Sequence, residues 1–241
     1  MGDDVALAYL HPNTVGHNFH SSLLKLVLWD SQKDQRLAQY LTMRSGSGGI
    51  VEARNNVVRQ FLDDVEDSIE WLFWLDSDMG FAPDVLDRLL AAADPVERPM
   101  VGALCFAWKE LEPDGFGGFH CAARPTIYHW VEGEDGHRRF VGLASYPPDE
   151  LVHTAATGSA CVLIHRSVLE AVDALDGEAY DRVRGTDGAR LGEDISFCVK
   201  VAACGFPMHV HTGVQTNHLK ELWVSEANLM AERIVAKAAT A

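Results

Sequence analysis

Short apolar runs alternate with amphipathic stretches through the first part of the chain. The apolar runs have the length and composition of buried strands, and they lie at Val5–Leu10, Arg36–Met43, Trp71–Leu75 and Pro99–Phe106. Between them, apolar residues recur at helical spacing in Phe19–Trp29, in Val51–Val65 and in a segment that Pro83 opens. Strands that alternate with helices predict a doubly wound, mostly parallel α/β sheet with helices on both faces.

The second half of the chain is predicted to be richer in β structure. Thr126–Val131 and Arg139–Leu143 flank a glycine-containing turn and predict a hairpin. The other segments predicted there are a strand at Ala160–Ile164, helices at Val168–Leu175 and Glu193–Ala203, a strand at Met208–Val214 and a closing helix at Ser225–Ala239. The Gly/Ser-rich piece Ser45–Gly49 is too short to link domains. We therefore expect a single domain over 1–241, with halves at 1–107 and 108–241.

Composition and charge exclude several classes of protein. With 47% hydrophobic and 23% charged residues, the chain has the composition of an ordinary globular protein. Its net charge of −15 gives no general attraction to nucleic acid or anionic membrane, although a local basic groove is not excluded. No basic segment precedes the first apolar run, and no stretch approaches the ~18 apolar residues of a membrane span. The five cysteines lack CxxC spacing, as is typical of free thiols, so we expect a cytoplasmic protein.

Two acidic motifs lie at positions where ligands bind in such sheets. Asp76 and Asp78 follow an apolar strand, and ligands of open α/β sheets sit beyond the carboxyl ends of strands. Paired carboxylates suit Mg or Mn, which would bridge to a diphosphate; the alternative interpretation is a polar turn that caps the next helix. Glu193 and Asp194 begin a helix, where one carboxylate can act as a general base or can simply complement the helix dipole.

Other residue types add weaker signals. His209 and His211 share a strand face and would suit zinc, but no further ligand stands at close spacing, whereas His218 can complete a distant metal site. Arg54 near a helix start can neutralise phosphate, and Trp108 after a strand can stack on a sugar or base or can be packing. No Walker A loop, GxGxxG or GxSxG motif is present, which counts against P-loop NTPases, typical dinucleotide-binding enzymes and α/β-hydrolases.

The order of the motifs is more specific than any one of them. Leu-His-Pro-Asn-Thr14 ends a strand, Ala-Arg-Asn55 opens a helix, and Leu-Asp-Ser-Asp78 follows the third strand. Ala-Thr-Gly-Ser-Ala160, Gly-Glu-Asp194 and Asn-His218 come later. From Val5 to Leu219 this order resembles the nucleotide-sugar glycosyltransferases of the GT-A fold, especially the small bacterial and phage members of the family-2-like group.

The resemblance implies roles for the matched residues. Asp76 and Asp78 match the Asp-x-Asp motif that holds Mn or Mg against the donor diphosphate, and His218 matches a further metal ligand. Asp194, within Glu193–Asp194, matches the general base of inverting members. The other residues expected at the donor are His11, Pro12 and Thr14 around the base and ribose, Arg54 near the nucleotide, Ser77 within the motif, Trp108, and Gly158 and Ser159 along the sugar and acceptor side.

The expected activity is a metal-dependent transfer of a sugar from a UDP-sugar to an acceptor hydroxyl, with inversion. The nucleotide-binding half is then 1–107 and the acceptor-side half 108–241. The acceptor stays open between a modified DNA base, a phage or bacterial protein and a small molecule. Two alternatives remain: a nucleotidyltransferase, which would normally carry a Gly-rich loop with Arg and Lys after the first strand, and a non-catalytic nucleotide-sugar-binding module.

Overall fold

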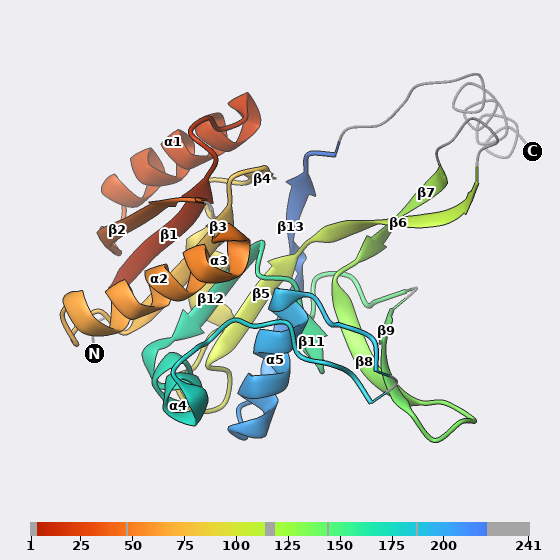
Figure 1. The fold of residues 1–241 in the computed structure, drawn as a ribbon. Coiled ribbons are helices and arrows are strands. Elements are labelled where there is room, and N and C mark those ends of the chain that lie inside the picture. Colours follow the sequence, from red (N-terminus) through yellow and green to blue (C-terminus); the bar gives the residue numbers. More distant parts are fainter. Residues whose placement is uncertain (1–3, 47, 114–118, 144, 187, 221–241) are drawn as a thin grey trace, which may run out of the picture.

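A sheet of eight strands forms the centre of the fold (Figure 1). The computed structural model describes residues 4–46, 48–113, 119–143, 145–186 and 188–220. The strand order is β10-β13-β5-β12-β3-β1-β2, and β4 pairs with β13 off this path. The strands are β1 (Val5–His11), β2 (Leu37–Arg44), β3 (Trp71–Asp76), β4 (Met79–Phe81), β5 (Met100–Leu104), β10 (Leu151–Thr154), β12 (Cys161–His165) and β13 (Met208–His218).

Most of the sheet runs in one direction. β1, β2 and β3 are parallel to one another, and so are β5 and β13. β12 lies antiparallel between β3 and β5, so those two strands also share a direction. The carboxyl ends of β1, β2, β3 and β5 therefore lie along the same edge of the sheet.

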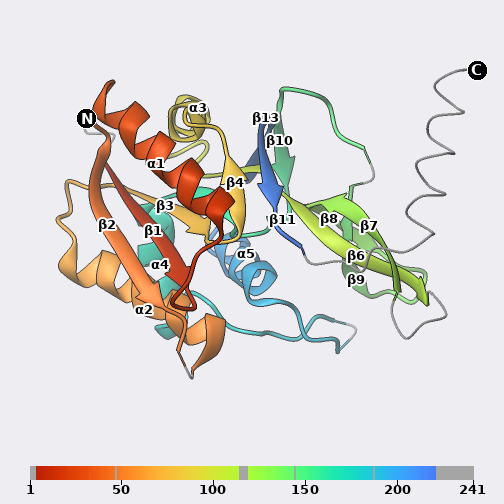
Figure 2. The same ribbon diagram turned by 90° about the horizontal axis from the view of Figure 1, so that it is seen from above.

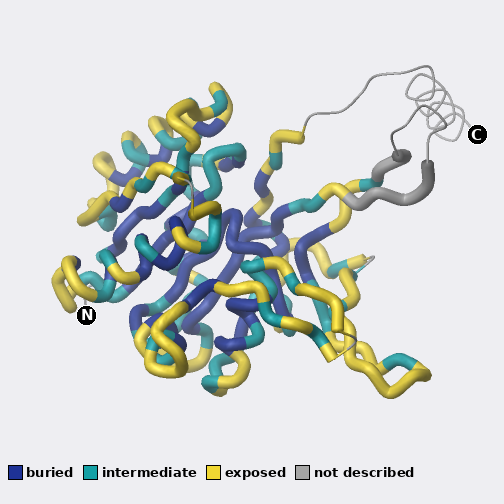
Figure 3. The backbone as a smooth tube through the Cα atoms, viewed as in Figure 1, coloured by how far each residue is buried: buried dark blue, intermediate teal, exposed yellow. Residues whose placement is uncertain are grey.

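Helices cover both faces of the sheet. The helices are α1 (His17–Ser31), α2 (Gly49–Asp64), α3 (Val85–Ala92), α4 (Arg166–Asp176) and α5 (Glu193–Ala203). Alternate residues of β3 divide between two cores: Leu72 and Trp74 pack with α2, α4 and α5, while Phe73 and Leu75 pack with α1 and α3. This two-sided burial explains why the strands are continuous apolar runs, and Figure 3 shows the sheet as the most buried part of the molecule.

Two hairpins extend from one side of the sheet (Figures 1 and 2). The first pairs β6 (Phe106–Pro113) with β7 (Phe119–Pro125). The second pairs β8 (Ile127–Glu132) with β9 (Arg138–Gly142), and β11 (Ala156–Thr157) joins it at β8. On the second hairpin, the rings of Trp130 and Phe140 stack with centroids 3.7 Å apart.

The predicted class, a doubly wound and mostly parallel α/β sheet, is confirmed. Within the described residues, the elements that periodicity predicted are present, most of them with shifted ends. The Glu193–Ala203 helix has the bounds that were expected. β4, β6, β7, β10 and β11 were not predicted, because they are short or lie on exposed hairpins with a weak apolar pattern. The predicted Ser225–Ala239 helix lies outside the described residues.

Two expectations about local structure were wrong. His218 does not follow its strand in a loop: β13 continues past a register break between His211 and Gln215 and ends at His218, since its last residues pair with β4 instead of β5. Trp108 does not lie in a loop beyond a strand end, because β6 begins at Phe106 and includes it.

Cys105, Cys161 and Cys198 are buried free thiols and Cys204 is a half-buried one, while the side chain of Cys121 is not described.

Asn55 joins the two halves of the chain. Its Oδ1 accepts a hydrogen bond from the backbone N–H of Tyr180 at 2.7 Å, and its Nδ2 donates to the Tyr180 carbonyl at 2.9 Å. Both residues are buried, so the amide satisfies two backbone groups that water cannot reach. It thereby places the Tyr180 ring against α2 and β3.

We predict that Asn55→Ala lowers the free energy of unfolding by about 2–4 kcal/mol, because it leaves the buried N–H and carbonyl of Tyr180 unpaired. Urea unfolding followed by circular dichroism measures the change. Asn56→Ala, one position along α2 with no side-chain hydrogen bond among the described residues, is the control and should cost less than about 0.5 kcal/mol. Equal losses in both variants would contradict the role assigned to Asn55.

Candidate active site

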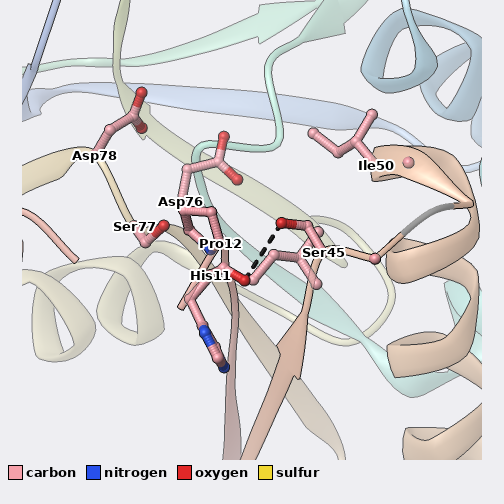
Figure 4. Close-up of a pocket in the computed structure, with 10 residues that line it drawn as sticks. His11, Pro12, Ser45, Ile50, Asp76, Ser77 and Asp78 are labelled. Carbon is pink, nitrogen blue, oxygen red and sulfur yellow. Dashed lines mark hydrogen bonds between the residues drawn. The ribbon is translucent and has the colours of Figure 1, made fainter. Parts of the chain in front are cut away.

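A cavity of about 450 Å³ opens where the carboxyl ends of β1, β2 and β3 meet (Figure 4). Parallel pairing places Leu10 opposite Asp76 and His11 opposite Arg44, so the loops that follow these strands leave the sheet side by side. The cavity is lined by Leu10, His11, Pro12, Ser45, Gly46, Gly49, Ile50, Asp76, Ser77 and Asp78. In Figure 4 the imidazole of His11 points away from the two carboxylates. The cavity therefore offers an acidic wall and a mostly uncharged one.

Asp78 contacts two cationic side chains at the rim of this cavity. His218 Nε2 lies 3.0 Å from Asp78 Oδ2, and Lys220 Nζ lies 3.6 Å from the same oxygen. The pairing of β4 with β13 brings them together, because Met79 lies opposite His218. Burial alone would raise the pKa of Asp78, but the hydrogen bond and charge of His218 and the charge of Lys220 outweigh it and lower the pKa.

His218 is held at both ring nitrogens. Its Nδ1 lies 2.8 Å from the carbonyl oxygen of Phe106, and its Nε2 faces Asp78. Both partners only accept hydrogen bonds, so their positions favour the ring that carries a proton on each nitrogen. The hydrogen bond to Asp78 accordingly raises the pKa of His218.

Arg54 lies beneath Asp76, with a side chain that is 2% exposed. Its Nη2 donates to Asp76 Oδ1 at 3.0 Å, and its guanidinium carbon lies 5.1 Å and 5.3 Å from the ring centroids of Trp74 and Tyr180. Among the described residues, Nε and Nη1 of Arg54 have no hydrogen-bond partner. Burial raises the pKa of Asp76, and the charge of Arg54 opposes that rise.

Asp194 and Glu193 lie in the first turn of α5. Oδ1 of Asp194 accepts a hydrogen bond from the backbone N–H of Ile195 at 2.8 Å. Its Oδ2 lies 3.5 Å from the position that a Cβ on Gly158 would take, so this small residue leaves room beside the carboxylate. Glu193 Oε1 lies 3.9 Å from Arg54 Nε. Burial raises the pKa of Asp194, and the negative charge of Glu193 adds to the rise.

The structure brings most, but not all, of the predicted residues to this region. His11, Pro12, Asp76, Ser77 and Asp78 line the first cavity, whereas Thr14 is exposed and does not. The buried Ser159 hydroxyl accepts a hydrogen bond from the hydroxyl of Tyr180 at 3.4 Å. Trp108 lies on β6 and lines a second cavity.

Several residues of the site were missed from the sequence. Ser45, Gly46, Gly49 and Ile50 line the cavity, and their position after the carboxyl end of β2 was the signal that could have found them. Lys220 and Tyr180 carried no such signal. They reach Asp78 and Arg54 through contacts between distant parts of the chain, which periodicity does not show.

Asp78 and His218 fit a divalent cation. A histidine that binds a metal through Nε2 commonly donates its other ring N–H to a backbone carbonyl, as the Phe106 contact allows. Asp76 instead faces Arg54, and across the described ranges no three His, Cys, Asp or Glu side chains form a metal-binding group. This also leaves the zinc alternative at His209 without support; His209 packs against His153, with ring centroids 5.5 Å apart.

No protein-family model matches the chain, and no curated protein matches it in sequence. Solved structures do resemble it. The crystal structure of GalNAc-T7 with UDP, GalNAc and Mn2+ matches with a TM-score of 0.56 and 11% identity, over 91% of this chain and 43% of that one. The crystal structure of A197 from STIV matches with a TM-score of 0.48 and 13% identity, over 90% of this chain and 86% of that one.

The chain spans less than half of the length of the GalNAc-T7 chain. At this level of identity the likeness concerns the arrangement of strands and helices and not the activity. The chain therefore has a mixed α/β fold of the GT-A glycosyltransferase type.

Proposed function

We propose that this protein is a metal-dependent glycosyltransferase that moves a sugar from a nucleotide-sugar, a UDP-sugar, to an acceptor hydroxyl. The observation that carries the proposal is the pairing of Asp78 with His218 at the rim of the strand-end cavity. The half-buried carboxylate of Asp194 lies in the first turn of α5 next to Glu193, and Glu193 in turn lies 3.9 Å from Arg54, the partner of Asp76. The similar fold of GalNAc-T7, whose structure contains UDP and Mn2+, supports the same type of donor.

The donor nucleotide occupies the first cavity in this proposal. His11 and Pro12 border its base and ribose on one side, and Ser45, Gly46 and Gly49 border them on the other. The helix α2 begins at Gly49, and the positive end of a helix dipole favours a phosphate there. Asp78 and His218 would hold Mn or Mg, and the ion would act as a Lewis acid that stabilises the negative charge of the leaving diphosphate.

The local charges make a cation necessary for this donor. Asp76, Asp78, Glu193 and Asp194 place four carboxylates around the site. The cations near them are already paired, Arg54 with Asp76, and His218 and Lys220 with Asp78. A doubly charged diphosphate would be repelled by this group of residues alone. Binding of UDP is therefore expected to depend on a divalent ion.

Asp194 takes the proton from the acceptor hydroxyl in this proposal. Because burial and the charge of Glu193 raise its pKa, the ionised carboxylate of Asp194 is a stronger base than that of an exposed aspartate. A base that activates the acceptor directly fits a single displacement, which inverts the anomeric carbon. Among the described residues no helix is both long and apolar enough to cross a membrane.

The metal site is tested by calorimetry with UDP. Wild type should bind UDP with Mn and bind it far more weakly in the presence of a chelator. Asp78→Asn should weaken Mn-dependent binding at least about tenfold, about 1.4 kcal/mol, because the amide keeps the shape but removes the charge. Asp63→Asn, at an exposed position of α2, should bind like wild type. Binding that is indifferent to the metal and to Asp78 would refute this donor site.

The base is tested by kinetics with the same donor. Asp194→Asn should lower kcat by a factor of about 10²–10⁴ while UDP affinity is retained, because the residue acts on the acceptor and not on the nucleotide. Product analysis by NMR should show an inverted anomeric centre. A product that keeps the donor's configuration, or a kcat near that of wild type, would contradict the role of Asp194.

The pH dependence of kcat reports the protonation of Asp194. Since the pKa of Asp194 is raised, activity should fall on acidification at a higher pH than an ordinary aspartate would give. Glu193→Gln removes the neighbouring negative charge, so the acid limb should move to lower pH. Glu97→Gln, at an exposed position away from the site, should leave the profile in place. An acid limb that does not move in Glu193→Gln would mean that another group titrates.

A further inference from the structure

A second cavity lies next to the first, and the side chains that contact Asp78 separate the two. It measures about 280 Å³ and lies between β6, β7 and the end of β13. His218 and Lys220 form part of its wall, and both contact the Oδ2 atom of Asp78, which lines the first cavity. One layer of side chains therefore separates the two cavities at the proposed metal site.

The start of β6 lies between the metal pair and the proposed base. The Phe106 carbonyl faces His218 Nδ1 at 2.8 Å, while the preceding carbonyl, of Cys105, accepts a hydrogen bond from the Thr126 N–H at 2.9 Å. The Thr126 side chain lies 3.7 Å from the Cβ position of Gly158, which also adjoins Asp194. A molecule held against the start of β6 is therefore next to His218, and Thr126 and Gly158 connect that strand to Asp194.

The second cavity has one aromatic wall and few polar groups that are free to bind. Trp108 is 41% exposed, and the residue opposite it on β7 is the small Ala123. The Asn217 side chain is exposed and makes no hydrogen bond within the part of the chain that the structure describes. Its amide both donates and accepts, which matches the hydroxyl groups of a sugar. The C–H face of a pyranose ring packs well on an indole.

The charges of the cavity argue against a phosphorylated acceptor. Its cations, His218 and Lys220, both face Asp78, so neither is offered unpaired to a phosphate. Nucleic acid binding depends on such unpaired cations, and the net charge of −15 opposes it further. A neutral ring with hydroxyl groups fits the wall better than a nucleotide does.

We propose that the second cavity binds a pyranose ring of a carbohydrate acceptor, with Trp108 as the stacking surface and the Asn217 amide as a partner for its hydroxyl groups. The assignment to the acceptor rests on the proposed function, in which the nucleotide fills the first cavity. The metal pair between the cavities then places the diphosphate on one side and the acceptor ring on the other.

Direct binding of simple sugars tests this assignment without an enzymatic assay. The full chain, with UDP and Mn present, is titrated with methyl glucoside, methyl galactoside and the methyl glycoside of N-acetylglucosamine, and binding is followed by saturation-transfer NMR. Wild type should bind at least one of them. Trp108→Ala should weaken that binding at least about tenfold, Trp108→Phe should restore most of it, and Asn217→Ala should weaken it severalfold.

Trp130→Ala is the matched control, since Trp130 is 42% exposed and lies on the neighbouring hairpin outside the cavity. It should bind the glycosides as wild type does. Circular dichroism and UDP calorimetry on each variant show whether it is folded, and Asn217→Ala carries the test if Trp108→Ala does not fold.

Three results would overturn the proposal: no methyl glycoside binds to wild type, Trp108→Ala and Trp130→Ala behave alike, or thymidine binds through Trp108 in preference to every glycoside. The proposed function fails separately. If wild type does not bind UDP with Mn, the donor site is wrong whatever the glycosides show; if UDP binds and the glycosides do not, only the acceptor assignment is lost.

Discussion

The site is arranged around a guanidinium group that water scarcely reaches. A buried cation costs several kcal/mol of desolvation unless anions and polarisable groups surround it. Arg54 has Asp76 at 3.0 Å, Glu193 at 3.9 Å and the rings of Trp74 and Tyr180 at its faces. These contacts connect α2, the end of β3, the start of α5 and the segment that follows α4. The positions of the acidic residues thus depend on one side chain that does not itself line the cavity.

This arrangement separates the two carboxylates of the Asp-x-Asp motif. Asp76 forms an ion pair with Arg54 in the interior, whereas Asp78 pairs with His218 and Lys220 at the rim of the cavity. The spacing of the motif explains the difference, because Asp76 is the last residue of β3 and Asp78 immediately precedes β4. In the proposed function Asp78 is the carboxylate that would bind the divalent ion, which would take the place of the proton between Asp78 and His218.

The sequence was sufficient for those features that depend on local pattern. Apolar runs located β1 and β3, and an acidic pair directly after such a run located Asp76 and Asp78. Glycines on either side of the Glu193–Ala203 segment predicted the ends of that helix.

The contacts that determine the chemistry of these residues could not be predicted from the sequence, because they depend on pairing between distant parts of the chain. His218 reaches Asp78 only because β13 breaks register and adds β4, and Tyr180 reaches Arg54 only through the Asn55 amide. Neither contact produces a periodic pattern in the sequence.

The antiparallel β12 shows why a departure from the regular sheet matters for the site. In a parallel sheet every strand delivers its carboxyl end to the ligand, and the residues before a strand lie at the opposite edge. β12 enters the sheet from the site edge, with Cys161 opposite Leu75, and the Ala160 carbonyl accepts a hydrogen bond from the Asp76 N–H at 2.8 Å. Gly158 and Ser159, which precede it, therefore lie beside Asp194 and Tyr180. Had β12 been parallel, the small residues that leave room next to the proposed base would lie at the far end of the sheet, and the second half of the chain could not complete a site that the first half begins.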